Sequence, residues 1–82
     1  MANFWCMKVN HKKYFELIGS NIKKSRQAQN LSQQKLADKC EKVDRSKISD
    51  IENAKEDFML STLLEICDAL SIDLSEITNK VD

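Results

Sequence analysis

The chain has 82 residues, which is enough for one domain with one small core. It contains no proline and a single glycine, which disfavours a β-sandwich built on tight turns and favours an all-helical domain. No apolar run is long enough to span a bilayer, and the first residues are too polar for a signal peptide, so we expect a cytoplasmic protein with no membrane partner.

The formal net charge is zero, but the charges are unevenly distributed along the chain. Residues 8–47 carry 11 Lys/Arg and 4 Asp/Glu, a net charge of +7, whereas residues 48–82 carry 2 Lys/Arg and 9 Asp/Glu, a net charge of −7. A phosphate backbone responds to the local patch rather than to the sum. The basic half is therefore compatible with nucleic acid, although a solvated helix face explains such a run about equally well.

Residues 1–16 are predicted to form an N-terminal arm and the start of the first helix. They hold four of the five aromatic residues: Phe4, Trp5, Tyr14 and Phe15. Clustered rings either cover one end of the core or dock a second subunit or another protein, and both interpretations stay open here.

The first helix is expected from near residue 10 to residue 29. Its buried stripe is expected to consist of Phe15, Ile18, Ile22 and Arg26. Gly19 lies inside this helix and costs about 1 kcal/mol relative to alanine, which indicates close packing there or a helix start nearer Leu17. Asn30 follows the helix, where a left-handed residue is often needed.

Residues 32–55 predict two short amphipathic helices separated by a tight break at residues 41–43. Ser32 can cap the first helix and Asp44 the second. The inward positions are Leu36, Ala37, Cys40, Ile48 and Ile51. A polar flank stays outside on the second helix: Arg45, Ser46, Ser49, Asp50 and Asn53. A short polar-flanked helix braced by a preceding helix fits the major groove of DNA, so we interpret the pair as a helix-turn-helix.

A mostly buried helix is predicted over residues 61–70 by apolar side chains at helical spacing: Leu60, Leu63, Leu64, Cys67 and Leu70. Ser71 is expected to end it. Asp73 and Glu76 have the spacing of a capping box, which predicts a short last helix over residues 74–79.

The cysteines give little sign of special chemistry. Cys6, Cys40 and Cys67 are widely spaced and odd in number, and His11 is the only histidine. We therefore expect no disulfide framework, no metal and no cofactor. Cys40 and Cys67 are expected in the core, with redox sensing as a minor alternative.

The order of these features resembles the Cro/C1-type (XRE-family) helix-turn-helix domain over residues 17–79, with residues 80–82 as a tail. The marks are LSQQKLA, the pattern IS-x-IE-N, and TLLEICDAL followed by a short capped helix. The resemblance implies an all-α, five-helix, lambda-repressor-like fold and a recognition helix at residues 45–53.

The resemblance also implies a set of site residues. Base contacts would come from Arg45, Ser46, Ser49 and Asp50. Phosphate contacts would come from Gln33, Lys24, Lys47, Asn53 and Lys55. Arg26 and Glu52 would form a structural ion pair, and Gln33 would also brace the recognition helix. For Arg45 and Lys47 the alternative is an ordinary solvated charge, and for the two serines it is contact with phosphate or water alone.

The sequence departs from the family pattern in three places. The break at residues 41–43 is one residue longer than usual and lacks its glycine, and we expect the extra residue to avoid a positive φ, which costs about 1–2 kcal/mol outside glycine. Ala54 stands where the family tends to have glycine, and Phe58 and Met59 stand where it tends to have Pro-Ser. Asp50 and Glu52 are acidic near the groove, where Asp50 could accept from cytosine N4 or repel phosphate.

We therefore predict a sequence-specific, double-stranded DNA-binding transcriptional regulator, a repressor, that binds a palindromic operator as a homodimer. No catalytic set of residues is present, so we expect no enzyme. The candidate dimer contacts are Leu74, Ile77 and Val81 of the last helix, and the aromatic arm. The alternative is a protein-interaction module, an antitoxin or adaptor, that uses the helix-turn-helix as a scaffold.

Overall fold

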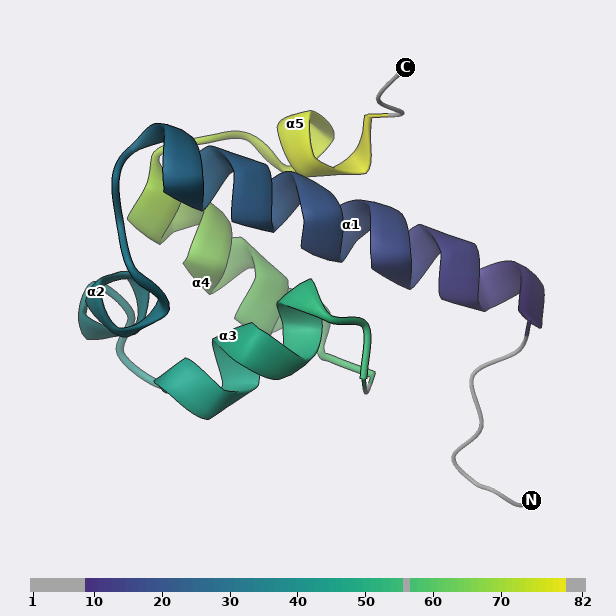
Figure 1. Ribbon diagram of the computed structural model, residues 1–82, viewed down its shortest axis with the longest axis horizontal. Coiled ribbons are helices and arrows are strands. Elements are labelled where there is room, and N and C mark those ends of the chain that lie inside the picture. The colour runs from purple at the N-terminus through teal and green to yellow at the C-terminus, as the bar shows by residue number, and fades with distance from the viewer. Residues whose placement is uncertain (1–8, 56, 80–82) are drawn as a thin grey trace.

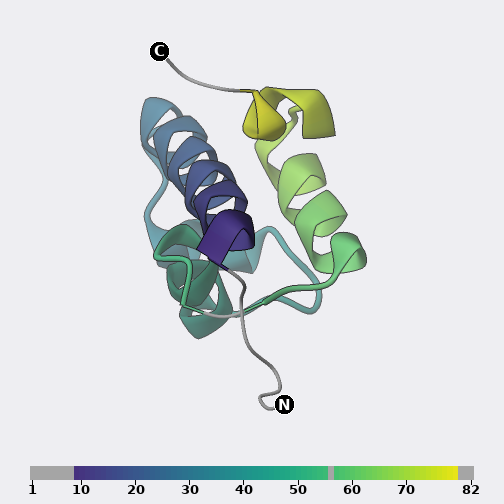
Figure 2. The same ribbon diagram turned by 90° about the vertical axis from the view of Figure 1, so that its right-hand side faces the viewer.

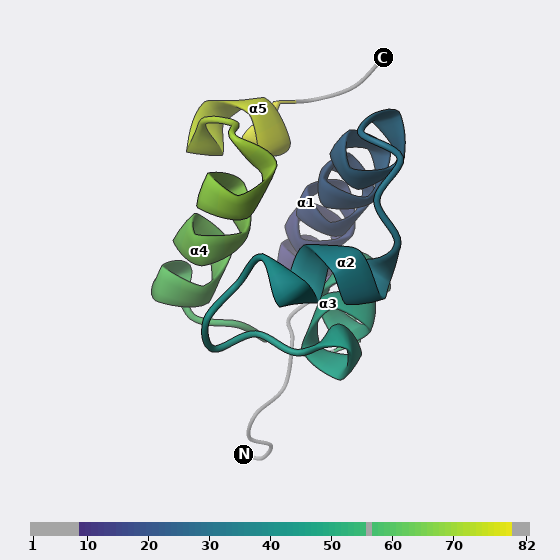
Figure 3. The same ribbon diagram turned by 90° about the vertical axis from the view of Figure 1, so that its left-hand side faces the viewer.

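The computed structural model describes residues 9–55 and 57–79, which form five helices and no strand. These are α1 (Val9–Ala28), α2 (Gln33–Asp38), α3 (Arg45–Glu52), α4 (Leu60–Leu70) and α5 (Leu74–Thr78). The long helix α1 crosses the molecule between α3 and α5 (Figure 1). Helices α1 and α4 lie side by side, with α5 above them and α2 and α3 below them in Figures 2 and 3. The predicted all-helical class is confirmed.

The helix ends follow the predicted capping residues. The Ser32 hydroxyl accepts from the Lys35 N–H at 3.0 Å, and the Asp44 carboxylate accepts from the Lys47 N–H at 2.9 Å. At the start of α5, Asp73 and Glu76 form the expected capping box. One boundary was misjudged, because α2 already ends at Asp38 and leaves Cys40 in the turn.

Three helices are followed, within two residues of their last one, by a residue with left-handed backbone: Asn30 (φ 59°), Ala54 (φ 53°) and Ser71 (φ 58°). In each case the following N–H donates to a carbonyl five residues earlier, at 3.1, 2.9 and 3.0 Å respectively. This pattern closes a helix end and usually places glycine at the left-handed position. The prediction for Asn30 is confirmed, and Ala54 carries a Cβ where the backbone disfavours one.

The core draws side chains from all five helices. The largest fully buried side chains are Ile22, Leu36, Ile48, Ile51, Ile66, Leu70 and Ile77. The predicted stripe of α4 is partly wrong, because Leu60 and Leu64 are 60% and 43% exposed and Ile66 takes the interior position. Both flanks of α4 are apolar, so the period alone could not tell which one faces inward.

Gly19 marks the closest approach of two backbones. A Cβ at Gly19 would lie 2.4 Å from the Ile51 carbonyl oxygen and 2.9 Å from that of Glu52. Since α1 begins at Val9, the interpretation of close packing is confirmed and that of a start nearer Leu17 is wrong. The glycine lets α3 pack directly on α1.

Two amide side chains that sequence analysis did not single out tie the helices together. The buried Asn21 donates from Nδ2 to the carbonyl oxygens of Ile77 (2.8 Å) and Asn79 (2.9 Å). Gln29 donates from Nε2 to the Leu70 carbonyl at 2.7 Å. These three bonds satisfy carbonyls at or just after helix ends, which lack partners within their own helix.

The aromatic side chains of the described residues lie in different environments. Phe15 packs edge-to-face on Phe58, with ring centroids 5.1 Å apart and an angle of 84° between the planes. Tyr14 is 57% exposed. Phe4 and Trp5 lie outside the described residues, whereas residues 9–16 of the predicted arm and helix start belong to α1. Within the described part of the chain, no helix has the length and apolar character needed to cross a membrane.

Candidate nucleic-acid interface

Helix α3 presents a polar flank opposite its buried one. Arg45 and Ser46 are exposed in its first turn, and Ser49 and Asp50 are half-buried. At 100° per residue these four side chains span an arc of about 140°, and the fully buried Ile48 and Ile51 project from the other side. The structure thus brings the four predicted base-contacting residues together on one surface.

The predicted phosphate-contacting residues are more scattered. Lys24 on α1 and Lys55 after α3 are exposed. Asn53 directs its side-chain amide to the Ser49 carbonyl at 2.9 Å, on the C-terminal end of its own helix. Lys47 is half-buried on the other flank of α3, where it helps to line a hollow of ≈ 370 Å³ with Asp57, Phe58, Met59 and Thr62.

A buried ion pair fixes α3 to α1. Arg26 donates from Nε to Glu52 Oε2 at 2.7 Å and from Nη2 to Oε1 at 3.1 Å, and both side chains are buried. Arg26 also donates from Nη1 to the Leu31 carbonyl at 2.7 Å, and Gln33 donates to Glu52 Oε1 at 3.1 Å. The carboxylate at the end of α3 is thereby bonded to α1 and to the first residue of α2. Planar, two-point pairing of this kind holds direction as well as distance.

The turn between α2 and α3 contains no left-handed residue, since the positive φ values of the described chain all lie elsewhere. The expectation that the longer turn avoids a positive φ is confirmed. Val43 in this turn is buried. The Glu65 carboxylate of α4 accepts from the N–H groups of Glu41 and, at 3.1 Å, of Lys42. Sequence analysis missed Glu65, because only the packing of α4 places it beside the turn.

The two cysteine thiols of the described chain are poorly reactive. Burial raises the pKa of Cys40, with a further rise from the Glu65 carboxylate. Burial likewise raises the pKa of Cys67, and Asp68, Asp73 and Glu76 add to it. Because the thiolate is the reactive form, these thiols are weak nucleophiles at neutral pH. In the described ranges no three His, Cys, Asp or Glu side chains are grouped to hold a metal ion.

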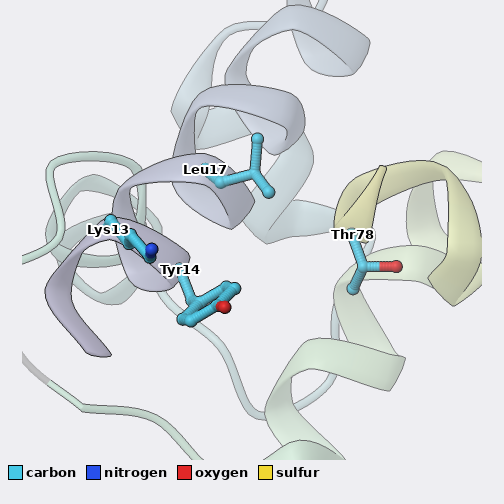
Figure 4. Close-up of a pocket in the computed structure, with 4 residues that line it drawn as sticks. All are labelled: Lys13, Tyr14, Leu17 and Thr78. Atoms are coloured by element: carbon cyan, nitrogen blue, oxygen red, sulfur yellow. The ribbon is translucent and has the colours of Figure 1, made fainter. Parts of the chain in front are cut away.

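A second hollow, of ≈ 480 Å³, lies between α1 and α5. It is lined by Lys13, Tyr14 and Leu17 of α1 and by Thr78 of α5 (Figure 4). The Lys13 ammonium lies 5.4 Å from the centre of the Tyr14 ring. Since α3 and α5 flank α1 on opposite sides, this hollow is remote from the polar flank of α3 (Figure 1).

A short polar-flanked helix, preceded across a tight turn by a second short helix and anchored through buried contacts, defines a helix-turn-helix protein. A family model described as helix-turn-helix matches residues 22–77, about two thirds of the chain. The chain therefore belongs to the Cro/C1-type (XRE) helix-turn-helix family, with the lambda-repressor-like fold of DNA-binding regulators. Searches of curated proteins and of solved structures found no match.

Proposed function

We propose that this protein is a sequence-specific transcriptional repressor that reads the major groove of double-stranded DNA with α3. The observation that carries the proposal is the arc formed by Arg45, Ser46, Ser49 and Asp50, held outward by the buried side of the same helix. A guanidinium can donate to O6 and N7 of guanine, and a carboxylate can accept from N4 of cytosine. The serine hydroxyls can donate or accept, so they can pair with donor or acceptor groups on the base edges.

Phosphate contacts would set the position of α3 in the groove. Gln33 supports this role, because its amide has two hydrogens and one donation to Glu52 leaves the other for a phosphate oxygen. Lys24 and Lys55 would contribute charge from either side of the helix-turn-helix. Lys47 and Asn53 belong to the proposed set as well, Lys47 from the other flank of α3 and Asn53 from its C-terminal end.

The charge distribution supports an oriented approach to the duplex. The basic half of the chain supplies α1, α2 and the start of α3, whereas the charged side chains of α4 and α5 are all acidic. Helix α5 lies on the opposite side of the molecule from α2 and α3 (Figures 2 and 3). A field with this polarity would turn the helix-turn-helix towards phosphate and the acidic end away from it.

A two-fold homodimer on a palindromic operator would supply the specificity that one unit lacks. Each good base contact discriminates by only about 1–3 kcal/mol, and paired half-sites about one helical turn apart multiply the effect. Ile77 is the buried residue of α5, so it cannot form the dimer contact that sequence analysis suggested. Tyr14 and Leu17, beside the hollow between α1 and α5, are better placed and would leave α3 free. Val81 lies outside the described residues.

The decisive experiment is selection of bound duplexes from a random pool, followed by measurement of the stoichiometry of the complex. We expect a palindromic consensus bound by two chains, with affinity that falls steeply as salt rises. A pool without enrichment would contradict sequence-specific recognition. A single chain on an asymmetric site would contradict the homodimer.

A protein-interaction module, an antitoxin or adaptor in the cytoplasm, is the second candidate. The observation that favours it is the exposure of apolar side chains at the start of α4, where Met59 is 70% exposed and Leu60 is similarly open. Met59 and Leu60 are neighbours along the chain, and contiguous exposed apolar surface is a feature of protein-protein interfaces. Such a module would show little dependence of duplex affinity on sequence or salt.

A further inference from the structure

The helix-turn-helix of this chain is held from outside by α4. In the turn, the N–H groups of Lys39 and Cys40 bond back to α2 at 3.0 and 2.9 Å. The next two N–H groups, those of Glu41 and Lys42, donate to Glu65 Oε2. Glu65 stands 24 and 23 residues further along the chain, so this part of the turn is closed by a long-range contact.

The longer turn needs such a contact. A left-handed glycine lets a short turn close through its own backbone, but no residue here adopts that conformation. The N–H groups of Glu41 and Lys42, which are neighbours in this turn, have the Glu65 carboxylate of α4 as their acceptor. A carboxylate is the strongest acceptor that a side chain can offer to two backbone donors at once.

We propose that Glu65 is a positioning residue for DNA recognition, which fixes the turn and thereby the direction of α3 relative to α2. This inference rests on the proposed reading of DNA by α3. Val43 of the turn and Ile48 of α3 are buried in the core and hold the fold without Glu65. Loss of the carboxylate therefore affects the direction of α3 more than the stability of the domain. Base contacts depend on direction, because hydrogen bonds weaken steeply with angle, whereas flexible lysines tolerate a tilt.

The test compares Glu65→Ala with Asp68→Ala, which removes the same charge from an exposed position one turn away on α4. Amide hydrogen exchange is measured for the free proteins, and affinity is measured for the selected duplex and a random one. In Glu65→Ala we expect the Glu41 and Lys42 amides to lose about tenfold protection, with a similar fall in the ratio of specific to random affinity. Asp68→Ala leaves both quantities unchanged. Glu65→Gln, which keeps one acceptor oxygen at the same reach, recovers most of the loss.

Two results would overturn the inference. One is equal protection of both amides in Glu65→Ala and the natural protein. The other is lost protection with an unchanged ratio of affinities. If the natural protein bound no duplex, the proposed function would fail, but amide exchange would still decide whether Glu65 holds the turn.

Discussion

Gly19 of α1 lies against the Ile51 carbonyl of α3 so closely that a methyl group at Gly19 would sit 2.4 Å from that oxygen. The contact joins the longest helix directly to the end of α3, beside the Arg26–Glu52 ion pair. No flexible side chain stands between the two backbones to absorb an added atom. The position of α3 therefore depends on the absence of a Cβ.

Gly19→Ala should destabilise the domain, although alanine favours a helix by about 1 kcal/mol more than glycine. Forcing the backbones apart costs typically about 1–3 kcal/mol, and the ion pair must stretch as well. Urea unfolding followed by circular dichroism measures the change. Ser20→Ala, an exposed neighbour on the same helix, is the matched control and should be close to neutral. A more stable Gly19→Ala protein would show that α1 and α3 are not in backbone contact.

Ala54→Gly should stabilise the protein by about 1 kcal/mol, because glycine adopts the left-handed φ of 53° without the strain of a Cβ. The same substitution at Ala28, the exposed last residue of α1, should instead cost up to about 1 kcal/mol. Thermal unfolding of both variants tests whether stability rises in Ala54→Gly and falls in Ala28→Gly. Equal destabilisation at both positions would contradict the left-handed conformation of Ala54.

Glu52→Ala should destabilise the fold by about 3–5 kcal/mol, because it leaves the buried Arg26 guanidinium without its carboxylate partner. Replacing both partners by apolar residues, as in Arg26→Met with Glu52→Leu, should recover much of this loss. Denaturant unfolding of the single and double variants gives the coupling between the two sites. A cost below about 1 kcal/mol for Glu52→Ala would indicate that the pair is solvated.

Arg45→Ala and Lys24→Ala should separate base reading from phosphate binding. We expect Arg45→Ala to cost about 1–3 kcal/mol on the selected operator and to relax preference at one base position. Lys24→Ala should weaken binding to all duplexes alike. It should also reduce the slope of log affinity against log salt concentration by about one. Fluorescence anisotropy titrations at several salt concentrations measure the affinity of each variant and its dependence on salt. A uniform loss in Arg45→Ala would move that residue to the phosphate-binding set.

The parts of the fold that sequence predicted best are those fixed by neighbours along the chain. Ser32, Asp44 and Glu76 act within three residues of their partners, so spacing alone was sufficient. Asn30 was predictable for the same reason, since it directly follows its helix.

What could not be predicted depends on contacts between distant segments. Asn21 meets a carbonyl 56 residues away, and Glu65 meets the turn more than 20 residues upstream. The spacing of residues along the sequence does not indicate such a distant partner for an asparagine or a glutamate. Helix α4 has apolar side chains on two flanks. Only its packing against the other helices determines that Ile66 is buried and Leu64 is exposed. At the candidate site, the period placed the polar arc of α3, but it did not reveal that Lys47 lies beside Phe58 and Met59.

The hydrogen bonds from Asn21 to the end of α5 have a practical consequence for labelling this protein. They anchor α5 on the side of the molecule that faces away from α2 and α3. A fluorescent label attached to an exposed residue of α5, such as Ser75, would therefore lie on the far side from a duplex held by α3. Labelling on α5 is the arrangement of choice for following the protein on DNA in single-molecule tracking.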